Sequence, residues 1–158
     1  MPRLSLHKNE RVALLRQVDL FSGCSTAELG RIAALTTEYR AEAGEVLAKR
    51  GDPGLEFFIV VEGRATVSRK RVELATIGPG SFFGELALLD GGPRTATVVA
   101  ETDMLLLVLS RREFSSVQAL VPSVTRKMLA ELGARLRKAD DLLDPGPVVS
   151  RRVGPWSL

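Results

Sequence analysis

The chain has 158 residues, of which 45% are hydrophobic and 26% are charged, and its formal net charge is +3. This length and composition predict one domain with its own hydrophobic core and leave too little chain for two full domains. We see no apolar run long enough for a transmembrane helix and no signal-peptide pattern at the start. His7 and Cys24 are the only histidine and the only cysteine, which excludes an internal disulfide and argues against a histidine-based metal centre. The lone cysteine suits a reducing compartment, so we expect a cytoplasmic protein.

Two helices are predicted before the first strand. Residues 8–18 place their apolar side chains on one side and their charged side chains elsewhere, as a helix of 3.6 residues per turn requires. Ser25 with Glu28 three residues later is a capping-box pattern, and it predicts a second helix that runs to about Leu35. We therefore expect residues 1–35 to form an N-terminal helical segment.

From residue 36 the sequence changes to short β-rich runs separated by turn residues. The runs are 46–48, 56–63, 64–68, 72–77, 95–101 and 104–109. About eight short strands with this spacing predict a mainly β domain over residues 36–110, an eight-stranded jelly-roll β-barrel with flanking helices. The basic triplet Arg69-Lys70-Arg71 is predicted at an exposed hairpin tip, either as a solvated turn or as a patch that binds a partner.

Residues 82–98 contain the main candidate binding residues of the chain, and their sequence is Phe-Phe-Gly-Glu-Leu-Ala-Leu-Leu-Asp-Gly-Gly-Pro-Arg-Thr-Ala-Thr-Val. Gly84 permits close approach of the backbone. Residues 85–89 favour a short helical turn, whose free N–H groups attract phosphate. Glu85 can accept hydrogen bonds from two hydroxyl groups, and Arg94 can hold a phosphate with paired donors. The stretch predicts a site for an anion beside a polar sugar; the alternative is a β-turn-β corner whose arginine pairs with a carboxylate.

Two further helices are predicted after the last strand. Ser110 and Glu113 repeat the capping-box pattern, and Pro122 can open the second helix. We expect C-terminal helices over residues 111–143 and a flexible Pro- and Gly-rich tail over residues 144–158. The last helix has one apolar stripe, which suits packing within the molecule or pairing of two subunits, so a monomer and a homodimer both stay open. The stripe comprises Val124, Met128, Leu129, Leu132, Leu136, Ala139 and Leu143.

The stretch 82–98 resembles the phosphate-binding cassette of the cyclic nucleotide-binding domain family. Members occur in catabolite-activator-like regulators, cyclic nucleotide-dependent protein kinases and cyclic nucleotide-gated channels. The family pattern F-G-E-L-A-L, a short loop and P-R-x-A-T-V is matched by residues 83–88 and 93–98, and the resemblance covers roughly residues 18–120. Kinase-type members carry an acidic residue before the aromatic strand, which supports the cassette arginine. Leu55 stands at that place here, so the resemblance leaves Arg94 without that partner.

The resemblance implies a cyclic nucleotide as ligand and no metal. The phosphate would be held by backbone N–H groups and Arg94, the ribose by Glu85, and the base by apolar residues under the C-terminal helix. The implied ligand-binding residues are Gly84, Glu85, Leu86, Ala87, Arg94 and Thr95 in the cassette, Val67 and Ile77 beneath the base, and Leu132 and Arg135, with Leu129 and Leu136, as candidates for its cap. We favour cyclic AMP (cAMP), although the hydroxyl of Thr95 leaves cyclic GMP (cGMP) open.

We expect a stand-alone bacterial sensor that changes its helix positions on ligand binding and signals to an unknown downstream protein. DNA binding is not expected, because only about 15 residues follow Leu143 and they contain no helix-turn-helix pattern. Enzyme activity is not expected, because no nucleophile–base pair or metal-ligand set is visible. The alternatives are the sensor domain of an ion channel or transcription regulator, and a degenerate scaffold domain that binds no ligand.

Overall fold

The computed structural model describes residues 5–143, and the tail predicted over residues 144–158 lies outside them. The chain divides into two compact units, Met1–Thr125 and Arg126–Leu158. The first unit contains every predicted strand and the cassette. The second is described by itself below.

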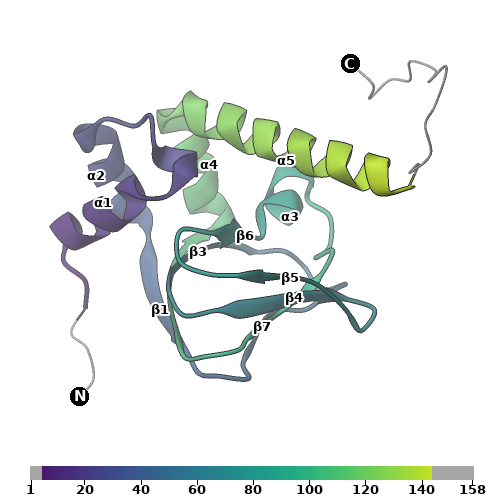
Figure 1. The fold of residues 1–158 in the computed structure, drawn as a ribbon. Helices are drawn as coiled ribbons and strands as arrows, with labels where there is room; N and C mark the ends of the chain where they lie inside the picture. The colour runs from purple at the N-terminus through teal and green to yellow at the C-terminus, as the bar shows by residue number, and fades with distance from the viewer. Residues whose placement is uncertain (1–4, 144–158) are drawn as a thin grey trace, which may run out of the picture. The chain divides into compact units, whose positions relative to one another are not determined.

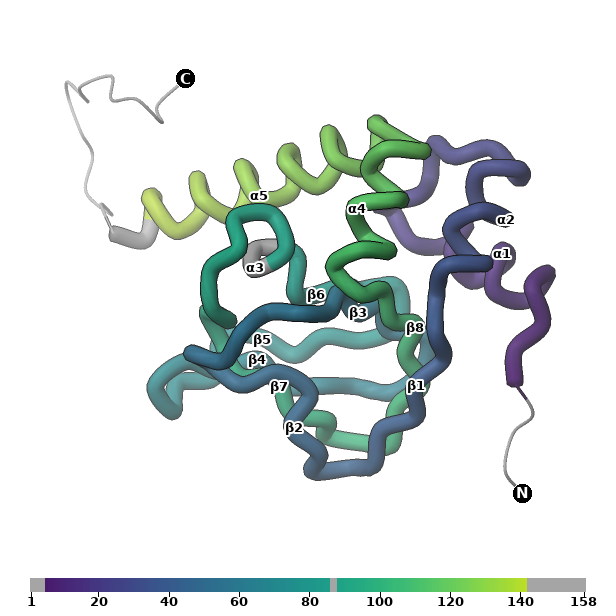
Figure 2. The backbone as a smooth tube through the Cα atoms, turned by 180° about the vertical axis from the view of Figure 1, so that it is seen from behind, coloured from purple at the N-terminus to yellow at the C-terminus, as the bar shows by residue number. Residues whose placement is uncertain are grey.

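Eight strands form two antiparallel sheets of four strands each in the first unit, with the orders β1-β8-β3-β6 and β2-β7-β4-β5 (Figure 1). The strands are β1 (Thr37–Ala41), β2 (Val46–Ala48), β3 (Glu56–Glu62), β4 (Ala65–Arg69), β5 (Val72–Ile77), β6 (Phe82–Phe83), β7 (Thr97–Ala100) and β8 (Met104–Ser110). The predicted jelly roll is confirmed in strand number and antiparallel pairing. It differs from a closed barrel, because no strand pairing joins the two sheets within the described residues (Figure 2).

The hydrophobic core lies between the two sheets, and β3 and β8 cross its centre. Phe58 and Val60 of β3 belong to this core. Because successive side chains of a strand point to opposite faces, Phe57 points the other way, where its ring centroid lies 5.1 Å from that of Phe114. Phe57 and Phe114 are both buried. Burial on both faces explains why β3 reads as one continuous apolar run rather than as an alternating one.

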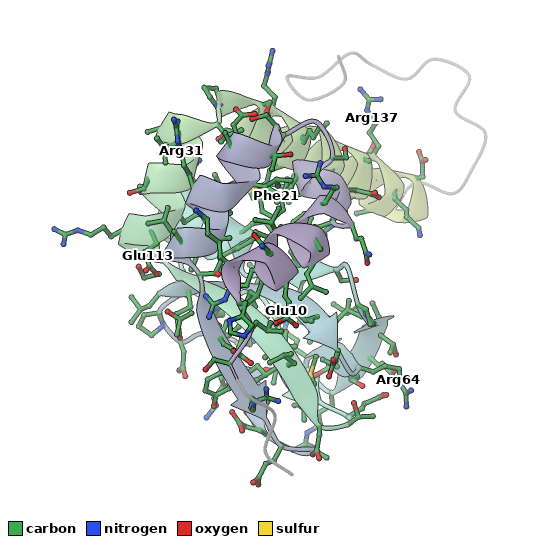
Figure 3. The ribbon with its side chains drawn as sticks, turned by 90° about the vertical axis from the view of Figure 1, so that its left-hand side faces the viewer. Glu10, Phe21, Arg31, Arg64, Glu113 and Arg137 are labelled. Atoms are coloured by element: carbon green, nitrogen blue, oxygen red, sulfur yellow. The ribbon has the colours of Figure 1, made fainter. Side chains whose placement is uncertain are left out.

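Helices cover the outer face of the β1-β8-β3-β6 sheet. The helices of the first unit are α1 (Lys8–Arg16), the short 3-10 turn η1 (Asp19–Phe21), α2 (Thr26–Leu35), α3 (Glu85–Asp90) and α4 (Arg111–Leu120). The packing of α4 involves α2, β3 and β8. Phe21 of η1 is buried close to the helices, as Figure 3 shows.

The predicted helix starts are confirmed. Ser25 accepts a hydrogen bond from the Glu28 N–H at 3.1 Å, and the Glu28 carboxylate accepts one from the Ser25 N–H at 2.8 Å. Ser110 and Glu113 make the same reciprocal pair at the start of α4, at 3.2 and 2.8 Å. These pairs satisfy N–H groups that the helix itself leaves without a partner.

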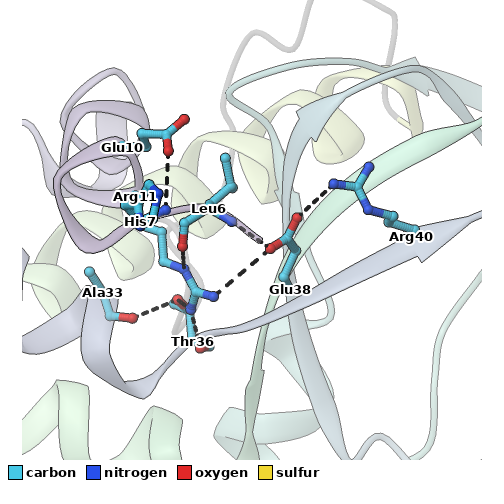
Figure 4. Close-up of polar contacts among 8 residues, drawn as sticks. All are labelled: Leu6, His7, Glu10, Arg11, Ala33, Thr36, Glu38 and Arg40. Atoms are coloured by element: carbon cyan, nitrogen blue, oxygen red, sulfur yellow. Dashed lines mark hydrogen bonds and ion pairs between the residues drawn. The ribbon is translucent and has the colours of Figure 1, made fainter. Parts of the chain in front are cut away.

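A polar network ties the N-terminal helices to β1 (Figure 4). We call Leu6, Arg11, Thr36, Glu38 and Arg40 the Arg11 network. Its central guanidinium donates to the Thr36 carbonyl at 2.6 Å and to the Leu6 carbonyl at 3.3 Å. The Glu38 carboxylate accepts from the Leu6 N–H at 2.9 Å and pairs with Arg40 at 3.0 Å. The network fixes the point at which the helical segment enters the sheet.

The helix α5 (Pro122–Leu143) begins in the first unit and continues into the second. Its start agrees with the prediction that Pro122 opens this helix, and the predicted end, Leu143, is the last residue that the structure describes. Within the second unit Arg135 pairs with Glu131 at 2.7 Å, one helical turn earlier. None of the helices among residues 5–143 is both long enough and apolar enough to cross a membrane.

Candidate functional site

The cassette begins where β6 ends and the chain turns into α3 at Gly84. The φ angle of Gly84 is +95°, a left-handed conformation that residues with side chains rarely adopt. A Cβ atom at this position would lie 2.5 Å from Nη1 of Arg94 and 2.7 Å from the Glu56 carbonyl oxygen. Gly84 is therefore required both by its backbone angle and by the close approach of the arginine.

A separate loop holds the backbone of the cassette arginine. We call residues 93–97 the arginine arm. The Arg94 N–H donates to the Asp52 carbonyl at 2.8 Å, and the Arg94 carbonyl accepts from the Gly51 N–H at 2.9 Å. The loop over residues 50–53, far away in the sequence, thus fixes the direction in which the Arg94 side chain leaves the arm.

The Arg94 side chain is 8% exposed and is held by main-chain carbonyl groups. It donates through Nη2 to the Glu56 carbonyl at 2.8 Å and through Nη1 to the Gly84 carbonyl at 3.4 Å. Its Cζ atom lies 5.8 Å from the centre of the Phe58 ring. These contacts take the place of the acidic side chain that is missing at Leu55, which is itself 59% exposed. A guanidinium has five N–H donors, so donors remain for a ligand.

Two carboxylates act on this buried positive charge. Burial lowers the pKa of Arg94, whereas the negative charges of Glu56 and Glu85 raise it. Since arginine stays protonated at neutral pH, the site holds one buried cation. Glu85 is 3% exposed and is the first residue of α3. Charges that are shielded from water interact more strongly than exposed ones. The site therefore suits a ligand that offers a negative group to Arg94 and hydroxyl groups to Glu85.

The other predicted cassette residues are sequence neighbours of Glu85 and Arg94. Leu86 and Ala87 follow Glu85 in α3, and Thr95 follows Arg94 in the arm. Val67 of β4 and Ile77 of β5 are partly buried against the core between the sheets. The register pairs Ala65 with Ile77 and Val67 with Ala75, which puts Val67 and Ile77 on one face of the sheet.

The predicted candidates for the base cap, Leu132 and Arg135, lie in α5 within the second unit. Their role stays a prediction. Residues 5–143 contain no cluster of three or more His, Cys, Asp or Glu side chains placed to hold a metal ion.

Two residues near the cassette were not predicted from the sequence. Glu56 holds Arg94 through its carbonyl and its charge. The sequence feature that could have identified it is the presence of an acidic residue directly after Leu55. Arg69 donates through Nε to the Thr95 carbonyl at 3.1 Å. It belongs to the basic triplet, of which only Lys70 and Arg71 form the hairpin turn, while Arg69 is the last residue of β4. No local pattern indicates that its side chain reaches the arm.

Comparisons with known proteins agree with this geometry. The family described as the cyclic nucleotide-binding domain matches residues 38–119. The acetyltransferase Pat of Mycolicibacterium smegmatis is 34% identical over 92% of the chain, and a cyclic nucleotide-gated potassium channel of Mesorhizobium japonicum is 39% identical over 70%. The chain covers 44% and 31% of these two relatives, so it spans less than half of their length.

A solved structure has a similar fold. The cAMP-bound PfPKA-R superimposes with a TM-score of 0.77 at 26% identity, over 87% of this chain and 47% of that one. The match to the family spans more than half of the chain and includes the sheets, Gly84, Glu85 and the arginine arm. The chain belongs to the cyclic nucleotide-binding domain family.

Proposed function

We propose that the chain binds cAMP at the cassette over residues 82–98 and passes the binding event to a partner protein through its helices. The observation that carries this proposal is the buried guanidinium of Arg94 beside Glu85, with Gly84 leaving room for it. This arrangement offers a cation for a phosphate and a carboxylate for a sugar hydroxyl. The proposed role is binding and regulation rather than catalysis.

In the proposed complex the cyclic phosphate lies at the start of α3. Backbone N–H groups of Leu86, Ala87 and Thr95 donate to the phosphate oxygens, and Arg94 neutralises the charge. Glu85 accepts a hydrogen bond from the ribose 2′-hydroxyl. The base rests on Val67 and Ile77, which share one face of the sheet.

The choice between the two nucleotides depends on Thr95. Its hydroxyl is the group next to Arg94 that can contact the amino group of guanine, so cGMP competes with cAMP for the proposed site. We propose cAMP as the preferred ligand, and the name of the cAMP-bound structure with the same fold supports this choice. Titration of one sample with both nucleotides decides the order of affinity.

Replacement of Arg94 or Glu85 by alanine tests the site. A hydrogen bond to a charged group contributes about 1.5–3 kcal/mol, so Arg94→Ala weakens binding by about tenfold or more. Glu85→Ala weakens it through loss of the ribose contact. Isothermal titration calorimetry with cAMP and cGMP measures both effects. Arg31→Ala is the matched control for charge, because Arg31 is an exposed residue of α2 (Figure 3).

Two outcomes contradict the proposal in different ways. Wild-type affinity in both cassette variants means that the nucleotide binds elsewhere. A folded wild-type protein that gives no heat with either nucleotide is a scaffold domain that has lost its ligand.

We also propose that ligand binding shifts the helices. The Arg11 network is the path that connects the sheet to α1, because it joins Arg11 to the first strand through Thr36 and Glu38. A ligand moves such an equilibrium only if it binds one arrangement more tightly than the other. Hydrogen exchange of the α1 and α4 amides with and without cAMP measures the shift, and identical exchange in both samples argues against it.

A further inference from the structure

Arg69 reaches the cassette from the β4–β5 hairpin. Its Nε donates to the Thr95 carbonyl at 3.1 Å, across 26 positions of sequence. The residue is exposed. Across the part of the chain that the structure describes, this is its one hydrogen bond, and no carboxylate pairs with it. The two terminal amino groups of Arg69 therefore remain available next to the arginine arm.

The hairpin turn fixes the position of Arg69. Lys70 and Arg71 form a two-residue turn with φ angles of +50° and +67°, a conformation that Asn-Gly adopts far more easily. Non-glycine residues in this region store strain, and strained turns are often kept at functional sites. The turn places Arg69 directly opposite Val72, so Arg69 is the last position of β4 that the ladder holds.

The arginine arm is held from two sides. On one side the loop over residues 50–53 binds its backbone, and the Arg50 N–H donates to the Thr97 hydroxyl at 3.1 Å. On the other side Arg69 holds the Thr95 carbonyl. The Thr95–Ala96 peptide would otherwise be fixed only through its neighbours. Its orientation matters because the Thr95 N–H, on the preceding peptide, is one of the proposed phosphate donors.

The charges around the site also leave a role for a second cation. Glu56 and Glu85 are the two carboxylates whose charges act on Arg94. A phosphate adds a further negative charge. Arg69 is the cation that contacts the arm, and it has no carboxylate to neutralise it among residues 5–143.

We propose that Arg69 is a positioning residue for the phosphate of the ligand. It holds the peptide after Thr95 so that the Thr95 N–H keeps its direction, and its charge offsets the carboxylates beside Arg94. This inference rests on the proposed function, because it names a residue that supports the same phosphate site. The β4–β5 hairpin then takes part in ligand binding and is more than a turn exposed to solvent.

The test compares Arg69→Met and Arg69→Lys with Arg71→Met by calorimetry with cAMP and cGMP at low and high salt. Arg71→Met removes the same charge from the same hairpin without touching the arm. Loss of one hydrogen bond weakens binding by about three- to tenfold, so Arg69→Met shows this loss at both salt concentrations. Arg69→Lys recovers part of it, since an ammonium can also donate to the carbonyl. Arg71→Met changes affinity by less than about twofold at low salt and not at high salt, because exposed charges are screened.

Amide resonances separate positioning from a general loss of structure. In the ligand-free protein, Arg69→Met shifts the NMR signals of the Thr95 and Ala96 amides, while the urea midpoint stays near that of Arg71→Met. Equal affinities of Arg69→Met and Arg71→Met overturn the role of Arg69 and leave the proposed function intact. A wild-type protein that binds neither nucleotide overturns the proposed function, and with it this inference.

Discussion

Among single residues, Gly84 combines a left-handed backbone with a close approach to the cassette arginine. A methyl group there meets both the guanidinium of Arg94 and the Glu56 carbonyl. We predict that Gly84→Ala lowers cAMP affinity by more than about tenfold, because displacing the guanidinium removes a charged hydrogen-bond donor from the site. Calorimetry measures the affinity, and urea unfolding measures the accompanying loss of stability.

Gly44 provides a matched control for this variant. Its φ angle is +90°, close to that of Gly84, but a Cβ atom there meets no heavy atom within 4 Å. Gly44→Ala therefore carries only the backbone strain, about 1–2 kcal/mol. If both variants lose the same stability and neither loses affinity, the close approach to Arg94 has no consequence for binding.

The sequence predicted the residues of the cassette but not the way in which they are held. Gly84, Glu85 and Arg94 lie within a short stretch, so their spacing carries the signal. One of the carbonyl groups that hold Arg94 lies outside the cassette: the Glu56 carbonyl is 38 positions away. Any residue type supplies a carbonyl, so no side-chain pattern records this contact.

Among the structural elements, α1 is tied to the residues before and within β1 by the side chain of Arg11. The Arg11 side chain is 19% exposed and donates hydrogen bonds to the carbonyls of Leu6 and Thr36. We predict that Arg11→Ala destabilises the first unit by about 1–3 kcal/mol, because these half-buried acceptors lose their donor. The free energy of unfolding in urea measures the effect, and hydrogen exchange shows whether the loss begins at α1.

Arg16→Ala is the control from the same helix. Arg16 donates to the hydroxyl of Thr26 at 2.9 Å in an exposed place, where water replaces the lost partner. We expect a change below about 0.5 kcal/mol. Equal destabilisation by the two variants means that helix propensity, rather than the Arg11 network, sets the stability of α1.

The elements were predictable to different degrees, for a physical reason. The starts of α2 and α4 follow from capping boxes that involve residues three positions apart, so the local sequence decides them. The strands follow from short β-rich runs bounded by turns. How the strands pair is decided by contacts across the whole chain, such as Thr37 with Val108. The sequence therefore predicted eight strands but not that they form two separately paired sheets.

For the whole molecule, the proposed site makes us expect that ligand binding and folding of the first unit are interdependent. The arginine arm is held by the loop over residues 50–53, by the first residue of β3, Glu56, and by Arg69 of β4. The unfolded chain brings none of these together, so we expect the proposed ligand to bind the folded state alone. Binding of this kind stabilises a protein by about 2.7 kcal/mol when the free ligand is at 100 times its Kd.

We predict that cAMP raises the urea midpoint of the wild-type protein in proportion to the logarithm of its concentration above Kd. Arg94→Ala shows a smaller rise at the same concentrations, because its affinity for cAMP is lower. Fluorescence or circular dichroism follows unfolding at several cAMP concentrations. The order of the midpoints with cAMP and cGMP gives the nucleotide preference, because the tighter ligand stabilises more at equal concentration. A midpoint that stays constant while calorimetry reports binding would mean that the arm opens without unfolding the sheets, which would separate the cassette from the folding of the unit.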